Sequence, residues 1–298
     1  MIKIDESYTI LGGQLRGRKP KFKVQKDGQV YIFKYGALNN EIYAELISEQ
    51  IGLQFGLDMA HYEIATYKNT VGVLTPSFLK PGQLIISSDN LKANMQQIYG
   101  ENNIYINISG HTIENLVNAA CTFDTRIKER NLTFDLLLRW VFYGVIMESD
   151  KNETNIGFVK GIDGFSLTPD YDNSSMAALN KNVANMIDSL RNGHNIYSLT
   201  DSIKSSFKIS DSDTGYFLQD FDTFSKKYPA ECAYCVARLS QIDVDLAFKR
   251  VEEINGIEIP WEIKYWVSKL VNSRIKDMQS IYEKNKYYFL GPQQVLTK

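Results

Sequence analysis

The chain has 298 residues, of which 44% are hydrophobic and 23% charged, and its formal net charge is −2. This composition is typical of a folded globular protein and excludes a disordered chain, and the balanced charge gives no basic footprint for direct nucleic-acid binding. No apolar run reaches the ~18 residues of a membrane span, and the first ten residues lack a signal-peptide pattern, so we expect a cytoplasmic enzyme or a translocated effector.

The first elements in the chain are predicted to be a β-hairpin and a helix. Residues 21–25 and 29–34 flank an Asp27-Gly28 turn, and the second segment is rich in β-branched and aromatic side chains. Apolar residues then recur at helical spacing over residues 40–55, and Gly56 is suited to end that helix. The pattern therefore predicts a strand pair followed directly by one helix.

Two more short strands are predicted at residues 61–67 and 70–74, before a segment rich in proline and glycine at residues 76–82. We place a domain boundary there, with a β-rich N-lobe over residues 1–80 and a mainly helical C-lobe over residues 81–298. The fold class that follows is α+β and bilobal.

The C-lobe carries one strongly periodic helix at residues 133–147. Two short β segments are predicted after it, at residues 156–160 and 165–168, and helices are predicted at residues 242–253 and 261–282. The β segments lie between two groups of acidic and amide side chains, which makes this region the first candidate for chemistry.

Three of those side chains stand in an order found in protein kinases. Asp150 is followed by Asn155 on the same loop, and Asp172 follows the β segments. In kinases the first Asp accepts the proton of the substrate hydroxyl, while the Asn and the later Asp hold magnesium. In isolation, an Asp and an Asn at this spacing are more typical of residues that cap and turn a loop.

The N-lobe carries residues suited to bind ATP phosphates. Lys34 ends a predicted strand, and the following helix carries Glu41 and Glu45, as in the lysine–glutamate pair of kinases. Upstream, residues 12–17 form a glycine-bearing segment that continues into basic residues. The basic residues of this segment that we expect at the phosphates are Arg18, Lys19 and Lys21. A surface lysine on a strand and a flexible basic loop are the plainer interpretations.

Several motifs resemble those of the HipA-like (HipA/CtkA) Ser/Thr protein kinase family. The matching segments span residues 10–175 in the family's order. They are Gly17-Arg18-Lys19-Pro20-Lys21, Tyr31-Ile32-Phe33-Lys34, Asn40-Glu41-x-Tyr43, the Asp150–Asn155 loop with Ile156-Gly157-Phe158, and Thr168-Pro169-x-Tyr171-Asp172-Asn173-x-Ser175.

The resemblance implies a protein-kinase-like fold, also similar to phosphatidylinositol kinases, with ATP and Mg²⁺ as cofactors. It implies Asp150 as catalytic base and Asn155 and Asp172 as metal ligands. It further implies that Lys34 contacts ATP and Glu41 orients Lys34, with Glu45 as a substitute one turn on. Gly17 belongs to the phosphate-binding segment, together with the basic residues named above.

The resemblance also implies a protein substrate and, as partner, an antitoxin or a small separate chain like the N-terminal subdomain of longer members. The chain departs from the family at Asn152, where a histidine is usual, and in having no Ser or Thr in residues 12–21. Two alternatives remain open: a pseudokinase that binds without transferring phosphate, and a kinase acting on a small molecule or lipid.

Overall fold

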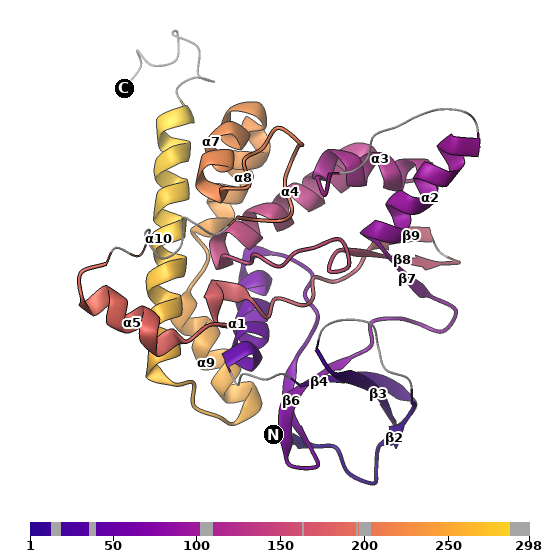
Figure 1. Cartoon of the computed structure of the whole chain (residues 1–298), viewed down its shortest axis with the longest axis vertical. Coiled ribbons are helices and arrows are strands. Elements are labelled where there is room, and N and C mark those ends of the chain that lie inside the picture. Colours follow the sequence, from indigo (N-terminus) through magenta and orange to yellow (C-terminus); the bar gives the residue numbers. More distant parts are fainter. Residues whose placement is uncertain are drawn as a thin grey trace.

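The computed structural model describes residues 1–12, 19–35, 40–101, 110–162, 164–194, 196 and 204–286. Figure 1 shows a β-rich part near the N-terminus beside a larger helical part. The strands are β1 (Ile2–Lys3), β2 (Thr9–Ile10), β3 (Lys21–Lys26), β4 (Gln29–Lys34), β5 (Glu63–Tyr67), β6 (Thr70–Pro76), β7 (Leu84–Ser87), β8 (Gly157–Gly161) and β9 (Gly164–Leu167). The helices are α1 (Asn40–Phe55), α2 (Ser88–Glu101), α3 (Ile113–Phe123), α4 (Glu129–Ile146), η1 (Met176–Ala178), α5 (Val183–Arg191), α7 (Phe217–Lys227), α8 (Pro229–Leu239), α9 (Val244–Asn255) and α10 (Trp261–Asn285).

The N-terminal sheet has six strands in the order β1-β5-β6-β4-β3-β2, and only the short β1 pairs in parallel. The predicted hairpin is confirmed: β3 and β4 pair antiparallel around Asp27 and Gly28, which both have positive φ. The register places Lys21 directly opposite Lys34. One face of the sheet covers a small core that includes Val24 and Phe33.

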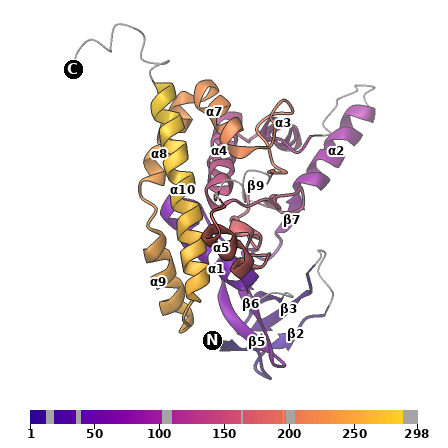
Figure 2. The ribbon, with the colours of Figure 1, turned by 60° about the vertical axis from the view of Figure 1, so that its left-hand side comes forward.

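The predicted helix after the hairpin is confirmed as α1, and most of it is buried. Its buried apolar residues belong to the larger core, and α1 packs against α4, α8 and α9 of the helical part. Figure 2 shows α1 among these helices, at the side where the sheet joins them. The helix directly follows the β3–β4 hairpin in sequence but packs in the core of the helical part, so it links the sheet to that core.

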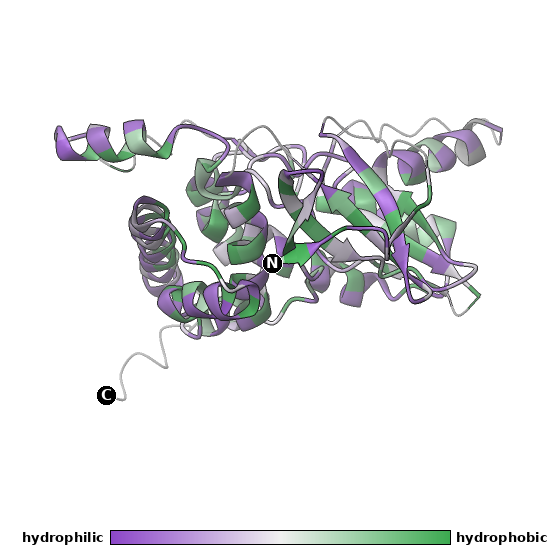
Figure 3. Cartoon of the chain, turned by 90° about the horizontal axis from the view of Figure 1, so that it is seen from below, coloured by the Kyte–Doolittle hydropathy of each residue, from purple (hydrophilic) through white to green (hydrophobic). Residues whose placement is uncertain are grey.

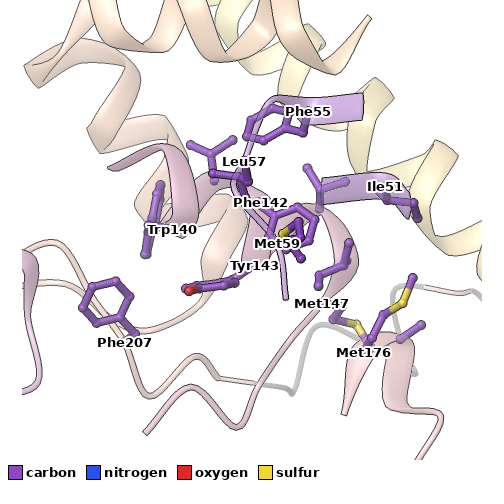
Figure 4. Packing of buried hydrophobic residues seen from close by; sticks show 14 of the residues in the cluster. Ile51, Phe55, Leu57, Met59, Trp140, Phe142, Tyr143, Met147, Met176 and Phe207 are labelled. Atoms are coloured by element: carbon purple, nitrogen blue, oxygen red, sulfur yellow. The ribbon is translucent and has the colours of Figure 1, made fainter. Parts of the chain in front are cut away.

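The centre of the helical part is α4, which begins before the predicted start at residue 133. Its second half is buried on all sides, and the ring of Phe142 stacks on Phe55 of α1 at 6.3 Å. Figure 4 shows these two rings with Trp140, Met147 and their neighbours. Met147 ends the helix in the left-handed conformation, so the chain turns there and enters the loop at Asp150.

A second sheet of three strands, in the order β7-β8-β9, supports that loop. The hairpin β8–β9 confirms the two predicted β segments, and β7 joins it from residues for which no strand was predicted. The same region forms α2 and α3, which pack against each other. Seen from below in Figure 3, hydrophobic and hydrophilic residues alternate along many helices and strands, as expected for elements buried on one side. In the described part of the chain, every helix is too short or too polar to cross a bilayer.

Candidate active site

The end of strand β4 brings Lys34 into contact with two carboxylates. Its Nζ lies 2.5 Å from Glu45 Oε1 on α1 and 2.5 Å from Asp172 Oδ1, which follows the β8–β9 hairpin. Glu45 is 1% exposed, and its second oxygen accepts a hydrogen bond from the amide of Asn173 at 2.9 Å. One ammonium group therefore joins the strand, the helix and the acidic segment of the C-lobe.

The charges at this junction keep each other ionised. Burial alone would lower the pKa of Lys34, but the carboxylates of Glu45 and Asp172 outweigh it and raise that pKa above its ordinary value. Burial alone would raise the pKa of Asp172, but Lys34, Lys21 and Lys151 outweigh it and hold the pKa well below its ordinary value. The site is thus a charged one at neutral pH.

Lys19 and Lys21 place further positive charge beside Lys34. Lys21 stands opposite Lys34 in the sheet, and burial, together with the neighbouring cations, lowers its pKa despite the charge of Asp172. Lys19 Nζ donates to Ser174 Oγ at 2.7 Å. These two predicted basic residues therefore converge on the site, whereas the predicted Gly17 and Arg18 lie outside the described residues.

The glutamate beside Lys34 differs from the first expectation. Glu41 does not contact Lys34; its carboxylate pairs with Lys19 at 2.9 Å, and Glu45 takes the position next to Lys34. The two glutamates lie on one face of α1 about one turn apart, so helical periodicity could not choose between them. The end of strand β4 places Lys34 beside Glu45 of α1 rather than beside Glu41, and this decides which glutamate pairs with the lysine.

The segment of residues 170–175, here called the Asp172 segment, is held tightly. Asp172 has a φ of 59°, a left-handed conformation that aspartate tolerates better than most residues. Its amide donates to the hydroxyl of Tyr62 at 3.1 Å, and its carboxylate accepts from Lys34. The backbone strain is held in place by contacts from two other parts of the chain.

Residues 150–155, here called the Asp150 loop, place Asp150 in a different environment. Its side chain is exposed, and Oδ1 accepts a hydrogen bond from Asn152 Nδ2 at 3.2 Å. Its backbone oxygen accepts from Asn155 Nδ2 at 2.7 Å, which brings these two predicted site residues together. The carboxylate is therefore oriented but still accessible to a substrate.

Lys151, next to Asp150, connects the loop to the Asp172 segment. Its side chain is fully buried, and Nζ donates to the backbone oxygen of Tyr171 at 2.5 Å and approaches Asp170 at 3.4 Å. Asp170 also accepts from Tyr143 and lies 3.7 Å from Arg139. Neither Lys151 nor Asp170 is among the predicted site residues, although both are charged and adjoin motif residues.

Asn155 and Asp172 supply oxygen donors suited to magnesium. Magnesium takes hard oxygen ligands and is commonly held by one or two protein groups plus phosphate oxygens and water. Among the described residues there is no group of three or more His, Cys, Asp or Glu side chains placed to hold a metal. Asn155 and Asp172 each have the ligand chemistry for a magnesium ion that also binds nucleotide phosphates.

Comparison with known proteins identifies the fold. No family model matches the sequence, and no curated protein matches it. Among solved structures, the Helicobacter pylori proinflammatory kinase CtkA superposes with a TM-score of 0.76 at 15% identity, covering 97% of this chain and 99% of that one. HipA of Shewanella oneidensis MR-1, solved with HipB and operator DNA, gives a TM-score of 0.59 at 13% identity and covers 94% and 68%.

These likenesses span nearly the whole chain, so they concern both parts of the molecule. Identities of this size establish the architecture and leave the chemistry to the site residues. They agree with the motif resemblance, which was drawn from residues 10–175 alone. The chain has the α+β, bilobal fold of the HipA/CtkA-like kinases.

Proposed function

We propose that this protein transfers the terminal phosphoryl group of ATP, with magnesium, to a serine or threonine of a protein substrate. The observation that carries the proposal is the junction of Lys34, Glu45 and Asp172. A strand lysine paired with a helix glutamate, beside an aspartate suited to hold metal, is the arrangement by which kinases position nucleotide phosphates.

The charges of the site support a triphosphate ligand. Lys34 and Lys21, with Lys19 at the rim, place ammonium groups where an anionic ligand would enter. A magnesium ion held by Asn155 and Asp172 would neutralise negative charge on the phosphates. In this structure the cation at Asp172 is the Lys34 ammonium.

Asp150 supports the transfer step. General base catalysis needs a carboxylate within reach of the hydroxyl proton, and the Asp150 side chain is exposed and held by its loop. In-line transfer then depends on orientation of the acceptor and electrostatic stabilisation rather than on a covalent intermediate. The exposure of Asp150 favours a large acceptor that approaches from solvent.

The test incubates purified protein with γ-labelled ATP, magnesium and a protein lysate, followed by phosphoamino-acid analysis. The variants are Asp150→Asn and Asp172→Asn, with Asp188→Asn as a control, since Asp188 is an exposed residue of α5. We expect labelled phosphoserine or phosphothreonine with wild type and control, and a loss of about 10³-fold in both site variants.

Other results would redirect the proposal. Label in small molecules alone would indicate a small-molecule kinase. Nucleotide binding without transfer would indicate a pseudokinase, and absence of nucleotide binding would refute the proposal. The HipA structure contains HipB, so we further propose a partner antitoxin; co-purification with the product of a neighbouring gene tests that point.

A further inference from the structure

The Asp150 loop is shaped by hydrogen bonds among its own residues, which cannot fix its position relative to the rest of the protein. Asn152 Oδ1 accepts from the amide of Thr154 at 3.0 Å, and Asn155 Nδ2 donates to the Asp150 backbone. Beyond these contacts, the buried Lys151 attaches the loop to the Asp172 segment. The opposite side of the loop faces the segment that contains β7, α2 and His111.

Lys92 of α2 makes the central contact on that side. Its ammonium group is buried and forms an ion pair with the carboxylate of Glu153 in the loop. The same Nζ donates to the backbone oxygen of Gly110 at 3.0 Å. One cation therefore links helix α2, the Asp150 loop and the residue that precedes His111.

Two further contacts join the same segments. Ser88, the first residue of α2, donates from Oγ to the backbone oxygen of Glu153 at 2.6 Å. His111 Nε2 lies 3.0 Å from the backbone oxygen of Lys151, and its ring packs 4.9 Å from that of Phe207. Burial lowers the pKa of His111 to about 4, so the ring is neutral, and Nε2 must carry the proton that the carbonyl accepts.

We propose that Lys92, assisted by His111, is a positioning residue that holds the Asp150 loop in its reactive geometry from outside the loop. The inference rests on the proposed function for its kinetic consequence, but its structural part is independent. Groups that orient catalytic residues without touching substrate commonly change activity 10–100-fold when removed, as for the residues behind metal ligands.

Lys92→Met tests the proposal with little risk to the fold. Glu153 is 32% exposed, so its carboxylate can turn to water when the lysine is lost. The control is Lys227→Met, which breaks the exposed ion pair between Lys227 of α7 and Glu114 of α3. Lys92→Arg keeps the positive charge and serves as the rescue variant.

The first readout is hydrogen exchange of a peptide spanning residues 148–156. We expect about tenfold faster exchange in Lys92→Met, with α4 unchanged, and wild-type exchange in the control and rescue variants. The second readout is phosphoryl transfer, for which we expect kcat to fall about tenfold while KM for ATP stays within about twofold.

Glu153→Gln, alone and combined with Lys92→Met, checks that the two residues act together. If they do, the double variant loses no more activity than the single variants. His111→Phe keeps the ring packing and removes the hydrogen bond to Lys151, and we expect about a threefold fall in kcat because hydrogen bonds of this kind are individually modest.

Unchanged exchange in the loop, or a general rise that includes α4, would overturn the proposal, as would a normal kcat with a loosened loop. An inactive wild-type protein would instead refute the proposed function. In that case, the exchange measurement would still decide whether Lys92 anchors the loop.

Discussion

Lys151 connects the Asp150 loop to the Asp172 segment, yet the two regions hold their carboxylates differently. Asp172 is held by a lysine from the sheet, by Tyr62 and by a left-handed backbone. Asp150 is exposed, and within the described ranges its carboxylate accepts a hydrogen bond from Asn152. The difference fits the two proposed roles, because a metal ligand needs a fixed position, whereas a base must remain accessible to its substrate.

The largest expected effect is a difference between the two regions in how much a mutation lowers the free energy of unfolding. Asp170 is 1% exposed and faces Lys151, Arg139 and Asn173, so Asp170→Ala leaves two buried cations without their carboxylate. We expect a loss of about 3–5 kcal/mol in the free energy of unfolding, measured by urea denaturation. Asp150→Ala, by contrast, should change it by less than about 0.5 kcal/mol. Equal losses of unfolding free energy in the two variants would show that the two carboxylates are held equally tightly.

A smaller effect concerns pH. The pKa of Asp172 in the folded protein lies below its ordinary value of 3.8, because Lys34, Lys21 and Lys151 outweigh burial. A lowered carboxyl pKa stabilises the fold above the ordinary value, and that stabilisation is lost as pH falls through the folded-state pKa.

The measurement compares wild type with Asp172→Asn in EDTA between pH 7 and the lowest pH at which both fold. The difference in unfolding free energy should be constant above pH ~5 and should shrink by about 1–2 kcal/mol below it. An exposed aspartate changed in the same way, Asp188→Asn, should show no such trend. A difference that grows on acidification would contradict the charge arrangement.

The smallest expected effect is that of Lys19, which also joins the N-lobe to the Asp172 segment. Its ion pair with Glu41 is partly exposed, at 28% and 14% for the two side chains. Lys19→Met should therefore cost less than about 1 kcal/mol in urea denaturation. A loss as large as that of Asp170→Ala would mean that the rim of the site, not its buried centre, holds the lobes together.

Much of the fold could be predicted from periodicity and turn chemistry. The β3–β4 hairpin, α1 and α4 appear where alternating or helical patterns are strong and where glycine or left-handed residues end them. No helix or strand was predicted within residues 84–130. The short strand β7 forms only because it pairs with β8, which lies far along the chain, so no local pattern marks it.

The candidate site was predictable where a motif fixes both residue type and order. Lys34 and Asp172 were singled out in this way and lie in contact in the structure. The choice of Glu45 over Glu41 was not predictable, because both share one face of α1 and only the docking of β4 distinguishes them.

The sequence by itself determined which residues can carry charge and chemistry, and in what order along the chain, because local patterns record local structure. Tertiary structure alone decided their partners. Lys92 and His111 reach the Asp150 loop from a region without a motif, and Lys151 is buried against Asp170 rather than solvated. The physical reason is that ion pairs and burial depend on distances between segments remote in sequence, which no local pattern encodes.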